Sequence, residues 1–145
     1  MFNEQFKQSM LEKAELMEAM EQKFGPQVVD VVKDYYRRRT LQAWEEKAKN
    51  EGSNTIDDIM RLLWQRLEPH GFEYTVEEKG SEVQLRVTKC KVYDIARELG
   101  VTRWAYYFHC ANDSFIVQGF NPDMGFKRSK TLMEGHDCCD HCYYF

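Results

Sequence analysis

The sequence predicts an α+β domain, in which N-terminal helices precede a roughly four-stranded antiparallel sheet of two hairpins, with helices packed on one face. Up to residue 68, apolar residues recur every three or four positions, as they do on an amphipathic helix. From residue 69 onward, two stretches alternate apolar and polar residues, as strands do. A chain of 145 residues suffices for one core but hardly for two. We therefore expect a single domain over residues 1–145, with a helical part (1–68) and a sheet-and-helix part (69–145) that carries the site.

In the helical part, clear start and stop signals separate the periodic stretches. Gly25 and Pro26 end the first stretch, because Pro breaks a helix interior but suits the first turn of a new helix. Thr55 followed by Asp58 resembles a capping box, a pattern that begins a helix. The sequence thus predicts three helices, over residues 3–24, 28–49 and 56–64.

The sheet-and-helix part begins with a predicted hairpin whose strands lie near residues 72–76 and 83–87. A short helix over residues 92–99 should stop at Gly100, a residue that readily adopts a left-handed cap. Thr102 is expected to cap a longer helix that ends near residue 118. The remaining predicted elements are two strands, over residues 126–133 and 139–145.

The composition excludes several classes of function. The net charge is −4 and basic residues are scattered apart from residues 37–39, so a nucleic-acid surface is not expected, and the short run is interpreted as a solvated helix face. No stretch approaches the roughly 18 apolar residues of a membrane helix. The first ten residues are polar, unlike a signal peptide, so we expect a cytoplasmic protein whose five cysteines are free thiols, ligands or nucleophiles.

The helix expected over residues 102–118 carries the first candidate site. Its Trp104 and Phe108 lie in one apolar stripe, whereas Cys110 and Asp113 lie together on the opposite side. Apart from Asp113, that side lacks the charged residues of an outer face, so it is either covered or lines a cavity. Two interpretations stay open: Asp113 is paired locally and Cys110 fills the core, or the two form a functional pair.

Two more thiols lie at the ends of predicted strands. Cys90 follows a strand and precedes a helix, where the helix dipole would favour a thiolate. In the last strand, Cys139 and His141 should face the core, whereas Cys138 and Cys142 lie on the opposite face as bystanders. Strand parity therefore argues against a zinc knuckle built from residues 139 and 142. Instead, we expect a composite site with members among Cys90, Cys110, Asp113, Cys139 and His141.

Taken in order, these features resemble the L-2-amino-thiazoline-4-carboxylic acid hydrolase family. The resemblance covers nearly the whole chain, including the stretch EGSNTIDDIMRLLW before the hairpin. Its motifs are a cysteine after a strand (Cys90), a C-x-x-D pair (Cys110, Asp113), GFNP (119–122), an arginine with a nearby TL pair (Arg128, Thr131, Leu132) and a G-x-x-x-C-D ending (Gly135, Cys139, Asp140).

The resemblance implies a bacterial or archaeal hydrolase-like protein that opens the ring of a small thiazoline or amidine carboxylate at a cyclic C–N bond. The family is also distantly similar to the small-molecule-binding domain of 4-vinyl reductases, which serves as a sensor or binding module. The alternative function is therefore a non-catalytic module that binds a small molecule or a metal.

For the enzyme, two mechanisms are open. In one, the thiolate of Cys90 or Cys110 attacks the substrate while Asp113 or His141 transfers protons. In the other, a divalent metal such as zinc or manganese activates water. Its ligands would be Cys90, Cys110, Asp113 and Cys139, or a subset of them. Arg128 is expected to bind the substrate carboxylate, with His141 beside the substrate.

The two remaining hypotheses involve no turnover. In a sensor, the same thiols would act as ligands or redox groups. In the simplest case, the thiols fill the core and the helical part forms a homo-oligomer. The methionines of the first predicted helix could then either cover the core or pair with another copy of the chain (Met10, Met17, Met20).

Overall fold

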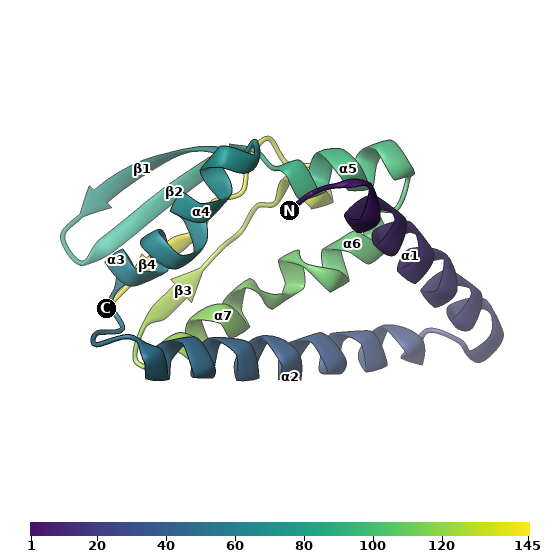
Figure 1. Cartoon of the computed structure of the whole chain (residues 1–145), viewed down its shortest axis with the longest axis horizontal. Coiled ribbons are helices and arrows are strands. Elements are labelled where there is room, and N and C mark those ends of the chain that lie inside the picture. The colour runs from purple at the N-terminus through teal and green to yellow at the C-terminus, as the bar shows by residue number, and fades with distance from the viewer.

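The computed structural model describes residues 1–145 and shows the expected α+β arrangement, in which two long helices lead into the sheet (Figure 1). Helix α1 spans Glu4–Phe24 and begins at Asn3, whose side chain accepts a hydrogen bond from a backbone N–H of the first turn. Helix α2 spans Gln27–Asn50. Gly25 joins them with a φ of 92°, which a residue with a side chain rarely adopts, so the turn falls where the sequence predicted it.

The methionines of α1 cover the core of this chain. Met10 is 1% exposed and packs with Ile95 and Ala105, and Met17 and Met20 border a second buried cluster beside α2. Met10 therefore has the first of the two roles that the sequence left open, and pairing of this helix with another copy of the chain stays a prediction. None of the helices combines the length and the apolar character needed to cross a membrane.

The third helical segment is longer than predicted and changes its winding. Helix α3 (Ile56–Ile59) begins with the predicted capping box, in which the Thr55 side chain accepts from the Asp58 backbone N–H and the Asp58 carboxylate accepts from the Thr55 backbone N–H. A π-helical turn follows and shifts the side chains behind it, as such turns often do near functional sites. The further elements are the π turn η1 (Met60–Trp64), α4 (Gln65–Leu67) and the 3-10 turn η2 (Glu68–His70).

The sheet has four antiparallel strands in the order β1-β2-β4-β3, so the end of the chain lies inside the sheet (Figure 1). The pairs β1–β2 and β3–β4 are the two expected hairpins. The strands are β1 (Glu73–Lys79), β2 (Glu82–Lys89), β3 (Gly125–Lys127) and β4 (Cys142–Tyr144).

Both C-terminal strands are shorter than the sequence predicted. The strand expected over residues 126–133 ends early, because Thr131 caps the 3-10 turn η4 (Leu132–Glu134) by accepting from the Glu134 backbone N–H. Before β4, an isolated bridge between Val87 and Cys139 continues the pairing with β2. Strand parity predicts that Phe145 faces the core together with Cys139 and His141, but its side chain is 58% exposed, so this prediction is wrong.

One face of the sheet carries the main core, as predicted. The register places Val87 opposite Cys139 and brings Leu85 and Tyr143 to the same side, where all four are buried. Helices α2, α3 and α7 cover this side through Trp44, Ile59 and Phe120, respectively. The other side of β2 is polar and lies outside this core (Gln84, Arg86, Thr88).

Helix α5 (Lys91–Leu99) and its left-handed cap at Gly100 are as predicted, but the helix expected over residues 102–118 is broken in the middle. His109 leaves the helical conformation at φ −126° and ψ −72°. The side chain of Asn112 donates to the carbonyls of residues 107 and 108, and thereby satisfies acceptors left free at the helix end. The first piece is α6 (Thr102–Phe108), whose N-cap position holds Val101 rather than Thr102 and has no side-chain cap. The 3-10 turn η3 (Cys110–Asn112) follows, and then α7 (Asp113–Phe120), which lies along α2 (Figure 1).

Candidate functional site

A cavity of about 570 Å³ lies between the covered face of the sheet and the helices. Its walls come from α1, α2, the π turn, β2 and the break between α6 and α7. The volume falls in the range of small-molecule pockets, and 17 of the 24 lining residues are hydrophobic, which is typical of such pockets. Five of the six predicted site residues line this one cavity: Cys90, Cys110, Asp113, Cys139 and His141.

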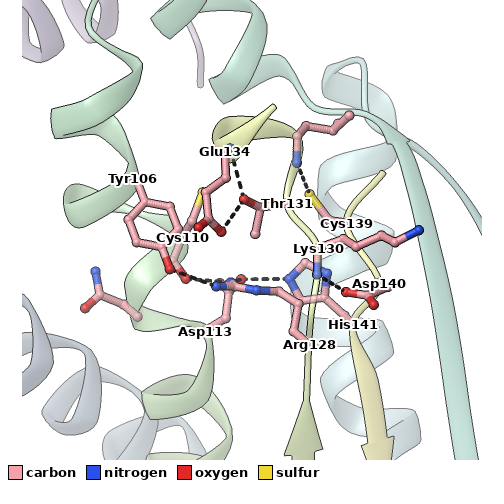
Figure 2. Close-up of polar contacts among 12 residues, drawn as sticks. Tyr106, Cys110, Asp113, Arg128, Lys130, Thr131, Glu134, Cys139, Asp140 and His141 are labelled. Carbon is pink, nitrogen blue, oxygen red and sulfur yellow. Dashed lines mark hydrogen bonds and ion pairs between the residues drawn. The ribbon is translucent and has the colours of Figure 1, made fainter. Parts of the chain in front are cut away.

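Asp113 is the centre of a polar cluster at the wall of this cavity (Figure 2). Its Oδ2 accepts a hydrogen bond from Arg128 Nη1 at 2.5 Å and lies 2.7 Å from His141 Nε2. Arg128 Nη1 also donates to the carbonyl oxygen of Cys110 at 2.7 Å, and Nη2 donates to the hydroxyl of Tyr106 at 3.3 Å. The cluster thus ties the end of β3 and the last strand to the break between α6 and α7.

The placement of Arg128 differs from the sequence-based expectation. We expected a guanidinium that binds a substrate carboxylate, but this one is held by Asp113 and does not line the cavity. Its role in the structure is to hold an internal carboxylate in place.

The electrostatics of the cluster fix the protonation of Asp113. Burial acts to raise the pKa of this carboxyl, but the charges and hydrogen bonds of His141 and Arg128 outweigh burial, and the net effect lowers the pKa. The carboxylate is therefore ionised at neutral pH and can only accept hydrogen bonds. It follows that His141 donates to this carboxylate through Nε2, and that in the neutral form of the imidazole the lone pair lies on Nδ1. That Nδ1 atom is buried and has no hydrogen-bond partner.

Trp64 holds the imidazole from the other side. Its ring packs against His141 at a centroid distance of 4.9 Å and an angle of 72°, and its Nε1 donates to the hydroxyl of Tyr143 at 2.9 Å. Trp64 is the last residue of the π turn, which thus presents its side chain to both partners. The orientation of His141 is thus set by Asp113 and Trp64 together.

The three thiols of the cavity are protonated at neutral pH. Burial raises the pKa of Cys90 to about 12 and that of Cys139 to about 11, and it raises the pKa of Cys110 well above its usual value. Cys90 is the N-cap of α5, as expected, and accepts from the Tyr93 backbone N–H at 3.5 Å. For this thiol, burial outweighs the helix terminus.

The family motifs around Cys139 position the last strand. Cys139 Sγ accepts from the Leu132 backbone N–H at 3.2 Å. The Asp140 carboxylate accepts from the backbone N–H groups of Ser129 at 2.8 Å and Lys130 at 2.6 Å. These contacts join the segment after β3 to the residues before β4, so Asp140 has a structural role (Figure 2).

No group of three or more His, Cys, Asp or Glu side chains is placed so that it could hold a metal ion. The four residues expected as ligands line the same cavity without forming a ligand set, so the metal-dependent mechanism stays a prediction. Cys138 and Cys142 do not line the cavity, in agreement with strand parity, but both side chains are only 1% exposed, so their face of the strand is covered as well.

Three further cavity residues were not predicted as site members. Burial lowers the pKa of His109 to about 4, so the imidazole at the helix break is neutral. Asn112 stabilises that break, and Arg39 belongs to the arginine run that the sequence analysis interpreted as a solvated face. Periodicity gave no signal for any of them, because all three lie within stretches of ordinary helical pattern.

Comparison with known proteins supports the resemblance. The family model described as L-2-amino-thiazoline-4-carboxylic acid hydrolase matches residues 3–143. No match was found among curated proteins. A similar solved structure is the phenol-responsive sensory domain of the transcription activator PoxR with phenol, with a TM-score of 0.56 and 11% sequence identity over 93% of this chain and 73% of that chain. At this identity the likeness shows a shared fold.

Proposed function

Because the chain belongs to the L-2-amino-thiazoline-4-carboxylic acid hydrolase family, we propose that it hydrolyses a cyclic C–N bond in a small thiazoline or amidine carboxylate. One observation carries the proposal. Asp113 and His141 form a hydrogen-bonded pair at the wall of a ligand-sized cavity, and the second imidazole nitrogen has no partner.

In the proposed reaction, a water molecule attacks the amidine carbon and transfers a proton to Nδ1 of His141. Asp113 keeps the imidazole in the required tautomer and stabilises the imidazolium that forms, as the carboxylate does in hydrolytic triads. The imidazolium then returns this proton to the ring nitrogen. The hydroxyl of the tetrahedral intermediate gives up its own proton, again through Nδ1, to the same nitrogen as the C–N bond breaks, so that a carbonyl and a primary amine form. Arg128 keeps Asp113 ionised throughout.

The thiol pKa values favour water over a cysteine as the nucleophile. At a pKa of about 12, roughly one Cys90 thiol in 10⁵ is ionised at pH 7. The cavity thiols would instead contact the substrate as weak S–H donors. A nucleophilic role for Cys90 or Cys110 would require the bound substrate to lower these pKa values.

The proposal is tested by following ring opening of L-2-amino-thiazoline-4-carboxylate by chromatography and mass spectrometry. His141→Gln should lower kcat by at least about 10²-fold, the usual contribution of a general base. His70→Gln is the matched control, because that histidine does not line the cavity and lies behind Phe2, a lining residue on which it packs. Cys90→Ala should change kcat by only a few-fold. Unchanged kcat in His141→Gln would exclude this residue as the base.

A second candidate function is binding without turnover, and the apolar lining of the cavity favours it. The structurally similar PoxR domain responds to phenol. In this chain, a phenol hydroxyl could donate to the free Nδ1 of His141. Stabilisation against heating by phenol, together with an absence of ring opening, would favour the sensor over the hydrolase.

The family match over residues 3–143 supports a single domain. A homo-oligomer through the helical part stays a prediction, to which the exposed Leu16, Phe24 and Val31 on α1 and α2 lend support. Cytoplasmic location also stays a prediction.

A further inference from the structure

Arg39 on α2 is the only lysine or arginine that lines the cavity. The three consecutive arginines of this helix differ in their partners. Arg37 and Arg38 both form ion pairs with Asp34, at 2.7 and 3.0 Å. Arg39 forms no ion pair or side-chain hydrogen bond, and its guanidinium lies 5.8 Å from the ring centroid of Tyr35. The run that resembled a uniform solvated face therefore contains one free cation at the cavity.

The charges around the cavity favour an anionic ligand. Asp113 is the only acidic side chain in the lining, and Arg128, which is not part of the lining, neutralises it. The charge of Arg39 has no such counterpart. A cationic ligand would find no free carboxylate in this cavity, whereas an anionic one would find an unpaired guanidinium, which binds carboxylates in bidentate fashion.

We propose that Arg39 binds the carboxylate of the ligand, so that the ligand is an apolar, ring-containing carboxylate whose other end lies at His141. The inference rests on the proposed function in placing the reacting end at His141. The anion site itself depends only on Arg39 and the cavity. The apolar lining, which includes Tyr36, Phe108 and Trp64, would contact the body of such a ligand. A bare thiazoline carboxylate has little apolar surface to match this lining, so the structure points to a carboxylate that bears a larger apolar group.

The experiment compares two probes that differ only in charge and have no scissile ring, 2-naphthoate and 2-naphthamide. Their affinities are measured by isothermal titration calorimetry for the wild type, Arg39→Gln and Arg38→Gln. The last variant is the matched control, because it removes the same charge one residue away and outside the cavity. Circular dichroism establishes that the variants are folded, which we expect because both side chains are exposed.

We expect the wild type and Arg38→Gln to bind the carboxylate at least ten-fold more tightly than the amide. Arg39→Gln should lose this preference through weaker carboxylate binding, with amide binding unchanged. A ten-fold change corresponds to about 1.4 kcal/mol, within the range of a charge-assisted hydrogen bond. Equal affinities in the wild type, a preference that survives Arg39→Gln, or no binding of either probe would overturn the inference.

These outcomes are separable from those of the hydrolase assay. If the carboxylate preference depends on Arg39 but the protein opens no cyclic amidine, the anion site is supported and the hydrolase function is refuted. If the wild type opens the ring and Arg39→Gln does so with an unchanged KM, the hydrolase function is supported and the anion site is refuted.

Discussion

Replacing Asp113 with Asn keeps the shape of the side chain and removes the charge that Arg128 and His141 share. The side chains of Asp113 and Arg128 are 22% and 12% exposed, so solvent screens the pair only weakly. A hydrogen bond to a charged group contributes about 1.5–3 kcal/mol, and the variant keeps one neutral acceptor but leaves Arg128 without a counter-charge. We therefore expect the free energy of unfolding to fall by about 2–4 kcal/mol at pH 7.

The effect of Asp113→Asn should depend on pH in a defined direction. Burial acts to raise the pKa of Asp113, but His141 and Arg128 lower it below the ordinary value of 3.8. A carboxyl with a lowered pKa in the folded state contributes stability that is complete above the unfolded pKa and is lost as pH falls through the folded pKa. The difference between wild type and variant should be constant above roughly pH 5 and should shrink below roughly pH 4.

Urea unfolding followed by tryptophan fluorescence measures this difference, with equal m-values as the check that unfolding stays comparable. Asp123→Asn is the control, because this exposed aspartate has no side-chain partner, and a change within about 0.5 kcal/mol is expected. A loss below about 1 kcal/mol at pH 7, or a loss that does not decrease in acid, would refute the argument that the cluster is held by charge.

Three further results follow from the structure. Trp64→Phe removes the donor to the buried Tyr143 hydroxyl, so the free energy of unfolding, measured in urea, should fall by about 1–3 kcal/mol. An unchanged free energy of unfolding would contradict a stabilising hydrogen bond. Gly119→Ala brings a Cβ to 2.8 Å from the Leu41 carbonyl oxygen and should cost about 1–3 kcal/mol by the same measurement, whereas Gly52→Ala meets no atom within 4 Å and should cost far less. Alkylation of the three cavity thiols by iodoacetamide, followed by mass spectrometry, should accelerate about ten-fold per pH unit between roughly pH 7 and 10. A plateau near pH 8 would show that burial does not control these thiols.

The sequence predicted the elements whose apolar pattern has a clear period, but it did not predict the break at His109. The stripe that begins with Trp104 and Phe108 continues in phase through the break, so periodicity suggests one helix. The break depends on Asn112, whose amide binds two backbone carbonyls. Such a local contact leaves the apolar pattern unchanged. The 3-10 turn after β3 had a readable signal that was missed, since Thr131 and Glu134 have the spacing of a capping box.

Strand parity predicted which side of the sheet Cys139 and His141 occupy, because a period of two leaves only two faces. The partner of a long side chain was not predictable in this way. Arg128 reaches Asp113 only because the break after α6 brings the start of α7 to the end of β3. Trp64, which contacts His141, likewise lies at the end of a π turn, which the apolar pattern does not reveal.

The two arginines near the site differ in whether they can change partners. If a ligand carboxylate took Arg128, it would leave Asp113 buried without a counter-charge, which costs several kcal/mol, and it would weaken the support of His141. Arg39 loses no ion pair when it binds an anion, because it has none. A ligand can therefore be held by its charge at α2 while the cluster of Asp113, Arg128 and His141 stays intact for the reacting end.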